Sequence, residues 1–113
     1  MVTNFYDKVV VNIKYKGFDG SGVLISDVEG NNSYLISAWH CFGKQSNIDY
    51  QEIEIFRQEE NVLKQISLNI KDKIIVEQSD IIIFEIDYLE DIPQYQIICP
   101  RKDRHFCICA TKK

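Results

Sequence analysis

Short apolar runs with an alternating pattern constrain this chain more than any other feature. The runs are rich in Ile, Val, Tyr and Phe and end at Gly, Asn or Asp, which is typical of strands between turns. In the run from Val9 to Tyr15, every odd position is apolar, and Asn12 and Lys14 lie between them. The run from Ile81 to Ile86 is apolar at nearly every position, which predicts a strand buried on both faces.

Six strands follow one another in this pattern, and no segment has the period of a convincing amphipathic helix. We expect the strands at residues 9–15, 21–27, 33–39, 49–58, 62–76 and 81–86. Turns are predicted at 16–20 and 29–32, and the long fifth strand is expected to bend near 71–73. A tight helical turn at 40–43 should end at Gly43. This order predicts an all-β domain, an antiparallel barrel or sandwich.

Composition excludes several classes of protein. The 113 residues are 45% hydrophobic, which suits one packed domain. Thirteen basic residues against seventeen acidic ones give a net charge of −4, and no basic tract is present, so we expect no nucleic-acid partner. No apolar run approaches the roughly 18 residues that span a bilayer. The first residues lack the pattern of a secretory signal, so no membrane partner and a cytoplasmic location are expected.

The four cysteines are too sparse for a disulfide-framed scaffold, and we expect free thiols. They are Cys41, Cys99, Cys107 and Cys109. His105 would share one face of a strand with Cys107 and Cys109, which suggests zinc. However, neighbouring positions on one face lie roughly 6.5–7 Å apart, too far for three ligands to converge on one ion. We therefore expect thiols in a core, with no metal or cofactor.

Three segments in order carry the chemistry. Gly20-Ser21-Gly22 opens a strand, residues 34–41 end a strand in His40, and residues 79–86 place Asp80 just before the most buried strand. A neutral imidazole accepts a hydroxyl proton near neutral pH, and a buried carboxylate fixes its tautomer and stabilises the imidazolium. His40 and Asp80, placed at the ends of two different strands, would be held rigidly enough to act as such a pair.

Structural alternatives exist for each of these residues. A histidine at a strand end is often a satisfied structural residue, and an aspartate before a strand is often a turn residue. Cys41 follows His40 directly and could be a nucleophile, but adjacent side chains rarely face each other. A buried, inert thiol is the favoured interpretation of Cys41.

The three segments resemble the first half of the chymotrypsin-like serine peptidases. In that family a G-[ST/G]-G strand precedes a T-A-A-H-C segment, and a D-I-A-L-L segment follows about 40 residues later. By this resemblance His40 matches the general base, Asp80 the carboxylate that orients it, and Cys41 the cysteine after the histidine. Residues 97–100, Ile-Ile-Cys-Pro, are similar to the segment that joins the two barrels of the family.

The resemblance implies a fold and an activity. Residues 1–92 would form a six-stranded antiparallel barrel, and residues 93–113 the linker and the start of a second barrel. The implied reaction is hydrolysis of peptide bonds in a polypeptide substrate through an acyl-enzyme. The serine would come from a C-terminal barrel or a partner chain, and no cofactor would be needed.

The sequence also departs from the family's pattern. Trp39 replaces a small residue, so an indole must pack beside the turn. Gly20 stands where the family has the disulfide partner of Cys41, as in an intracellular bacterial-type relative. No G-D-S-G-G segment is present; Asp19-Gly20-Ser21-Gly22 mimics it but precedes the histidine, so Ser21 is not expected to be the nucleophile.

Two other functions remain open at this stage. The domain could be a catalytically inactive, protease-like binding or regulatory module that has the barrel without a nucleophile. It could also be a small zinc or redox protein that uses its cysteines. If the chain is half of a peptidase, apolar surface meant for a partner should be exposed around His40.

Overall fold

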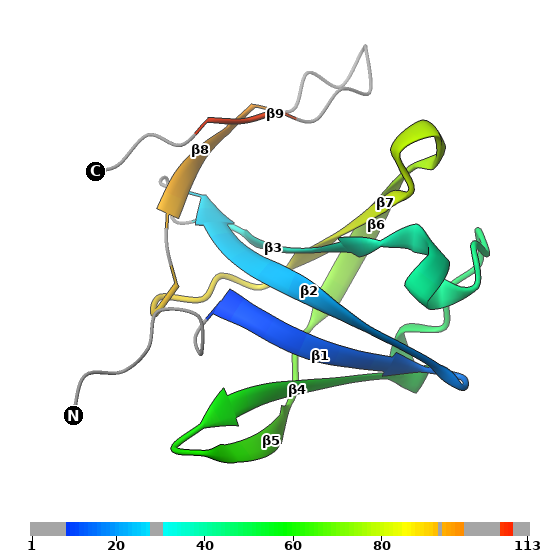
Figure 1. The fold of residues 1–113 in the computed structure, drawn as a ribbon. Helices are drawn as coiled ribbons and strands as arrows, with labels where there is room; N and C mark the ends of the chain where they lie inside the picture. The colour runs from blue at the N-terminus through cyan, green and yellow to red at the C-terminus, as the bar shows by residue number, and fades with distance from the viewer. Residues whose placement is uncertain (1–8, 28–30, 93, 99–106, 110–113) are drawn as a thin grey trace.

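The computed structural model describes residues 9–27, 31–92, 94–98 and 107–109, and these form an all-β structure (Figure 1). Its strands are β1 (Val10–Tyr15), β2 (Phe18–Asp27), β3 (Ser33–Ala38), β4 (Ile53–Glu59), β5 (Val62–Ile66), β6 (Ile70–Val76), β7 (Ile81–Ile86), β8 (Gln94–Ile98) and β9 (Cys107–Cys109). Three 3₁₀ turns are η1 (Trp39–Phe42), η2 (Tyr50–Glu52) and η3 (Glu77–Ser79). Within the described ranges, no helix has the length and apolar character needed to cross a membrane.

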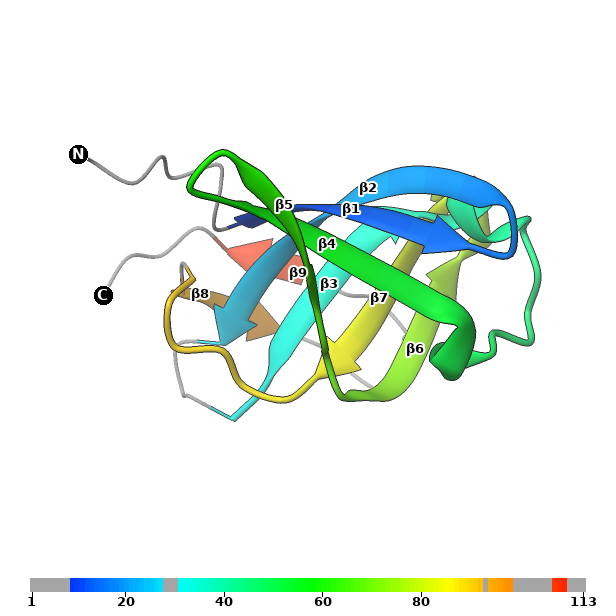
Figure 2. The same cartoon turned by 90° about the horizontal axis from the view of Figure 1, so that it is seen from below.

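Seven strands pair along one antiparallel path in the order β5-β4-β1-β2-β3-β7-β6. Strands β3 and β7 are neighbours although about 40 residues separate them in the sequence (Figures 1 and 2). Strand β8 adds to the end of β2 in parallel and pairs with β9. The predicted all-β class is confirmed. The pairing does not establish the predicted six-stranded barrel, which requires the sheet to close on itself.

The turn between the first two strands is tighter than predicted. Lys16 and Gly17 both have positive φ, 46° and 87°, and Tyr15 pairs directly with Phe18. The second strand therefore begins at Phe18 rather than at Ser21. Two residues with positive φ suit the right-handed twist of a hairpin, so the strands continue pairing up to the turn.

The predicted strands 49–58 and 62–76 are each divided. The first becomes the 3₁₀ turn η2, where the Asp49 side chain accepts a hydrogen bond from the Gln51 backbone, followed by β4. The second becomes β5 and β6, separated by residues 67–69, with a register irregularity between Ile70 and Asp72. The predicted bend near 71–73 is thus a break slightly earlier in the chain followed by a bulge, which lets the strand change direction.

Both faces of the sheet carry apolar clusters, and β7 contributes to each. The larger cluster contains the fully buried Ile82, Phe84 and Ile86, and the smaller one contains Ile83. This confirms the prediction that the run is buried on both sides. Burying each of these side chains contributes about 1.5–3 kcal/mol.

Aromatic rings connect η1 to the main cluster. The Phe42 ring lies 5.3 Å from that of Tyr15 and 5.2 Å from that of Phe84, centroid to centroid. Phe42 is fully buried, so the turn that follows β3 is anchored from inside the sheet. Tilted and edge-on pairs of this kind add about 0.5–1.5 kcal/mol to the burial of the rings.

A buried serine pair ties the segment after β7 to the end of the sheet. Ser26 Oγ donates to the Leu89 carbonyl (2.7 Å), and Ser33 Oγ accepts from the Leu89 backbone N–H (2.7 Å). The two hydroxyls are 2.6 Å apart, so Ser33 donates its proton to Ser26. Each hydroxyl is fully paired although both residues are completely buried.

Replacing Ser33 with alanine is expected to lower the free energy of unfolding by about 1–3 kcal/mol, because the Leu89 N–H loses its partner away from water. Denaturant unfolding of Ser33→Ala measures this loss. Ser46→Ala, at an exposed position, is the control and should change stability by less than about 0.5 kcal/mol. Equal stability of the two variants would contradict the role given to the buried pair.

Candidate active site

His40 lies on a short turn that the sequence ends within a few residues. The 3₁₀ turn η1 follows β3 directly and stops at Gly43, whose φ of 68° is left-handed. The Gly43 N–H donates to the His40 carbonyl (3.1 Å). Phe42 is buried while the His40 side chain is 63% exposed, so the anchored turn holds the imidazole at the surface. The predicted helical turn ended by Gly43 is confirmed.

Asp80 lies between η3 and β7 in an unusual backbone conformation. Its φ and ψ are 56° and 43°, the left-handed region, which costs a residue with a side chain about 1–2 kcal/mol. The Asp80 N–H donates to the Glu77 carbonyl (3.2 Å), and the Asp80 carbonyl accepts from the Trp39 N–H (2.9 Å). The second bond continues the pairing of β3 with β7 beyond the partners Ala38 and Ile81. It places Asp80 beside His40, the residue after Trp39.

The two predicted site residues meet through both oxygens of the carboxylate. His40 Nδ1 lies 2.5 Å from Asp80 Oδ2, and the His40 backbone N–H donates to Asp80 Oδ1 (3.0 Å). A carboxylate at this position accepts the Nδ1 proton, so the lone pair of a neutral ring lies on Nε2. Nε2 makes no hydrogen bond with any residue in the described part of the chain. The pair is therefore arranged to accept a proton at Nε2.

Electrostatics favour the charged form of Asp80. The hydrogen bond from the His40 side chain lowers the pKa of Asp80 below its ordinary value. Desolvation opposes this, while the charge of His40, the hydrogen bond from its backbone and the charge of Lys44 also lower the pKa. Asp80 is therefore a carboxylate at neutral pH.

The carboxylate is not buried, contrary to the sequence-based expectation. The side chain of Asp80 is 36% exposed and that of His40 is 63% exposed. Both residues lie at the ends of strands, where the described part of the chain leaves one side of the pair open to solvent. Water therefore competes with the interaction between the two groups.

Cys41 is a buried free thiol, as predicted. Strand β2 passes close to it: a Cβ built on Gly20 would lie 2.7 Å from the Cys41 Cβ and closer still to its sulfur. Gly20 is therefore needed for close approach of the strand to the turn. Ser21 is exposed, and its hydroxyl makes no hydrogen bond with His40 in the described structure.

Trp39 packs beside the turn, as the sequence predicts. Its indole is partly buried against the main cluster, and its Nε1–H donates to the Gln45 carbonyl (3.0 Å). Two neighbours of the site were missed from the sequence. Lys44 contributes charge near Asp80, and Phe18 lies with its ring against Gly43, where a Cβ would be 3.0 Å from the ring. No periodicity or motif marks either residue.

The structure describes only part of the cysteine and histidine residues that suggested a zinc site. Cys99 and His105 lie outside the described residues, and only the backbone of Cys107 and Cys109 is described, in β9. Among residues whose side chains are described, no group of three His, Cys, Asp or Glu is placed to hold a metal ion.

Comparisons with known proteins leave the site to be interpreted from its own geometry. No protein-family model, no curated protein and no solved structure matches the chain.

Substituting Gly20 with alanine should destabilise the turn that holds His40. Because the new methyl group would overlap the sulfur of Cys41 and lie 2.7 Å from its Cβ, we expect a loss of about 1–3 kcal/mol in unfolding free energy. In a Cys41→Ala background the sulfur is gone, so the same substitution should cost less. Ser21→Ala is the control and should leave the unfolding free energy unchanged. Equal costs of Gly20→Ala in the wild-type and Cys41→Ala backgrounds would contradict this contact.

The lowered pKa of Asp80 should make stability depend on pH at the acid end. A depressed carboxylate contributes stability above its unfolded pKa, near 3.8, and loses it as the pH falls through the folded value. The stability difference between the wild type and Asp80→Asn should therefore shrink below about pH 4. Chemical unfolding at a series of pH values measures it. In a His40→Ala background this pH dependence should weaken, and an unchanged profile would contradict His40 as its main cause.

Proposed function

We propose that this chain is the base-carrying half of a chymotrypsin-like serine endopeptidase. One observation carries the proposal: Asp80 binds both the ring and the backbone N–H of His40, and it leaves Nε2 free for a reacting group. A merely structural histidine needs one partner for its ring. Here the backbone is held as well, so the imidazole is fixed in position and in tautomer.

We also propose that the sheet is closed into the six-stranded barrel of that family. β5 and β6 are the two ends of the pairing path, and only residues 67–69 separate them in the chain. If the two act as one bent strand, the path β4-β1-β2-β3-β7 closes on itself. Closure would support a rigid site, because His40 and Asp80 would then lie at the rim of a continuous sheet.

The reaction requires a serine from outside this chain. As that serine Oγ attacks the peptide carbonyl, its proton passes to His40 Nε2, and Asp80 stabilises the imidazolium. The proton then moves to the leaving nitrogen, the C–N bond breaks and an acyl-enzyme remains. Water, deprotonated by His40, hydrolyses the ester in the same way. The serine and the oxyanion hole would lie on a second barrel, continuous with this chain or in a partner chain.

A fluorophosphonate probe tests the proposal on the full-length gene product in its native assembly. The probe phosphonylates an activated serine and releases fluoride. We expect stoichiometric labelling that His40→Ala abolishes and that Asp80→Asn slows by on the order of 10⁴, because the ring then loses the partner that sets its tautomer.

Asp91→Asn is the matched control, since it alters another exposed aspartate that contacts Arg57 rather than the site. It should be labelled at the rate of the wild type. If no serine of the full-length product or of its assembly is labelled under any condition, the chain is a binding or regulatory module that has the pair without the nucleophile.

A further inference from the structure

Trp39, the residue before His40, connects three segments of the site. Its backbone N–H donates to the Asp80 carbonyl (2.9 Å), and its carbonyl accepts from the Lys44 N–H (3.3 Å). Its indole Nε1–H donates to the Gln45 carbonyl (3.0 Å), while the ring is partly buried against the main cluster. One residue therefore links the segment of Asp80 to the chain that leaves the turn of His40.

The peptide bond between Trp39 and His40 is held at both ends. Its N–H, that of His40, donates to Asp80 Oδ1 (3.0 Å), and its carbonyl, that of Trp39, accepts from Lys44. Because a peptide unit is planar, its N–H and its C=O turn together. The bond from Lys44 therefore keeps the His40 N–H aimed at the Asp80 carboxylate.

Lys44 donates this bond from a strained conformation. Gly43 and Lys44 both have left-handed φ values, 68° and 54°. Glycine adopts this conformation at little cost, whereas the Cβ of a lysine is crowded by its own backbone. Rotation of the peptide between Gly43 and Lys44 would relieve the strain, and it would turn the Lys44 N–H away from the Trp39 carbonyl. The exit from the turn therefore needs further contacts that hold it in place.

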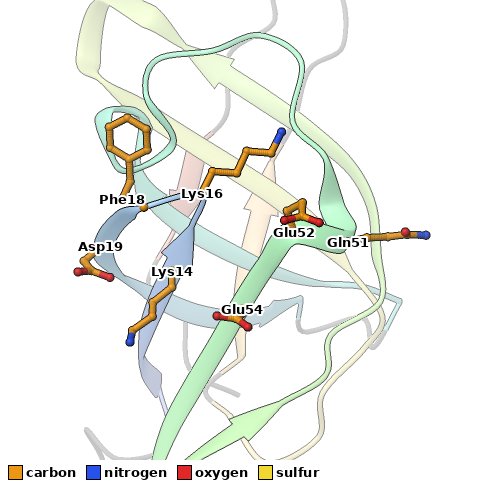
Figure 3. Close-up of a pocket in the computed structure, with 8 residues that line it drawn as sticks. Lys14, Lys16, Phe18, Asp19, Gln51, Glu52 and Glu54 are labelled. Carbon is orange, nitrogen blue, oxygen red and sulfur yellow. The ribbon is translucent and has the colours of Figure 1, made fainter.

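Two aromatic side chains hold the chain where it leaves the turn. The Phe18 ring lies against Gly43, where a Cβ would be 3.0 Å from the ring. It stands at the rim of a pocket of about 410 Å³, apart from the carboxylate of Glu52 (Figure 3). A phenyl ring packs against backbone without a hydrogen bond, whereas the indole of Trp39 donates to the Gln45 carbonyl, just after the strained lysine. Phe18 therefore supplies packing, and Trp39 supplies the hydrogen bond.

We propose that the Trp39 indole is a positioning residue for His40; its benefit to catalysis rests on the function proposed above. The bond from Nε1–H to the Gln45 carbonyl, here called the indole clamp, keeps Lys44 in its left-handed conformation. Lys44 then holds the carbonyl end of the peptide whose N–H binds Asp80, so the imidazole stays aligned with the carboxylate. The chymotrypsin-like peptidases that the sequence resembles have a small residue at this position, which could not make such a bond.

Backbone hydrogen exchange of the full 113-residue chain tests the indole clamp without a substrate. The protection factor of the His40 amide reports how often its bond to Asp80 opens. In Trp39→Phe an aromatic ring remains and the donor is lost, so this protection should fall roughly two- to tenfold, the change that one ordinary hydrogen bond allows. The amides in the middle of β3 should change less. Replacing Trp39 with 3-benzothienylalanine, which has sulfur in place of the indole N–H and nearly the same shape, should have the same effect.

A second pair of variants tests the strain at Lys44. In the Trp39→Phe background, Lys44→Gly should restore most of the protection of His40, because glycine adopts the left-handed conformation without the clamp. Lys44→Ala removes the same charge but keeps a Cβ, so it should not restore the protection. Gln45→Ala retains the backbone carbonyl and should leave the protection at the wild-type value.

These measurements separate positioning from stability and from catalysis. The role of Trp39 is overturned if the His40 amide keeps its protection without the indole N–H, or loses no more protection than the amides of β3. It is also overturned if Lys44→Gly and Lys44→Ala have equal effects. In the full-length product, Trp39→Phe should slow fluorophosphonate labelling by a similar two- to tenfold factor. Absence of labelling in the wild type would refute the peptidase, and hydrogen exchange would still decide the role of Trp39.

Discussion

The antiparallel pairing of β3 with β7 is the constraint on which the rest of the site depends. The pairing sets Ala38 opposite Ile81, so the residues just past these two strand ends must lie side by side. The bond from the Trp39 N–H to the Asp80 carbonyl extends that register by one step. A slip of one residue would turn every buried side chain of β7 to the other face, so burial of Phe84 on one side and Ile83 on the other protects the geometry of the pair.

The site combines a rigid support with an open face. Phe42 anchors the turn from below through its contacts with Tyr15 and Phe84, while both side chains of the pair remain accessible to water. Catalytic groups gain strength when solvent is excluded, so a pair of this kind acts fully only when a second surface covers it. The proposed second barrel would supply that cover together with the nucleophile. The exposed Phe18 beside the turn offers apolar surface at the same place.

Much of the fold could be predicted because burial has a simple period in strands. The alternation from Val9 to Tyr15 identified β1 and its buried face, and the doubly apolar run identified β7 as an interior strand. Boundaries were less predictable. The start of β2 at Phe18 depends on two positive φ values, and the break between β5 and β6 depends on which partner each half meets; neither is a property of local sequence alone.

The sequence by itself determined the strand-rich class and the turn ended by Gly43, because these follow from residue types and their spacing. His40 and Asp80 were chosen from the sequence because their segments resemble the motifs of a peptidase family. Only the tertiary structure decided that Asp80 takes a left-handed conformation, uses both oxygens and stays partly exposed. It alone placed Phe18 against Gly43. Contacts between distant residues arise from strand register and from packing across the sheet, and no local pattern encodes them.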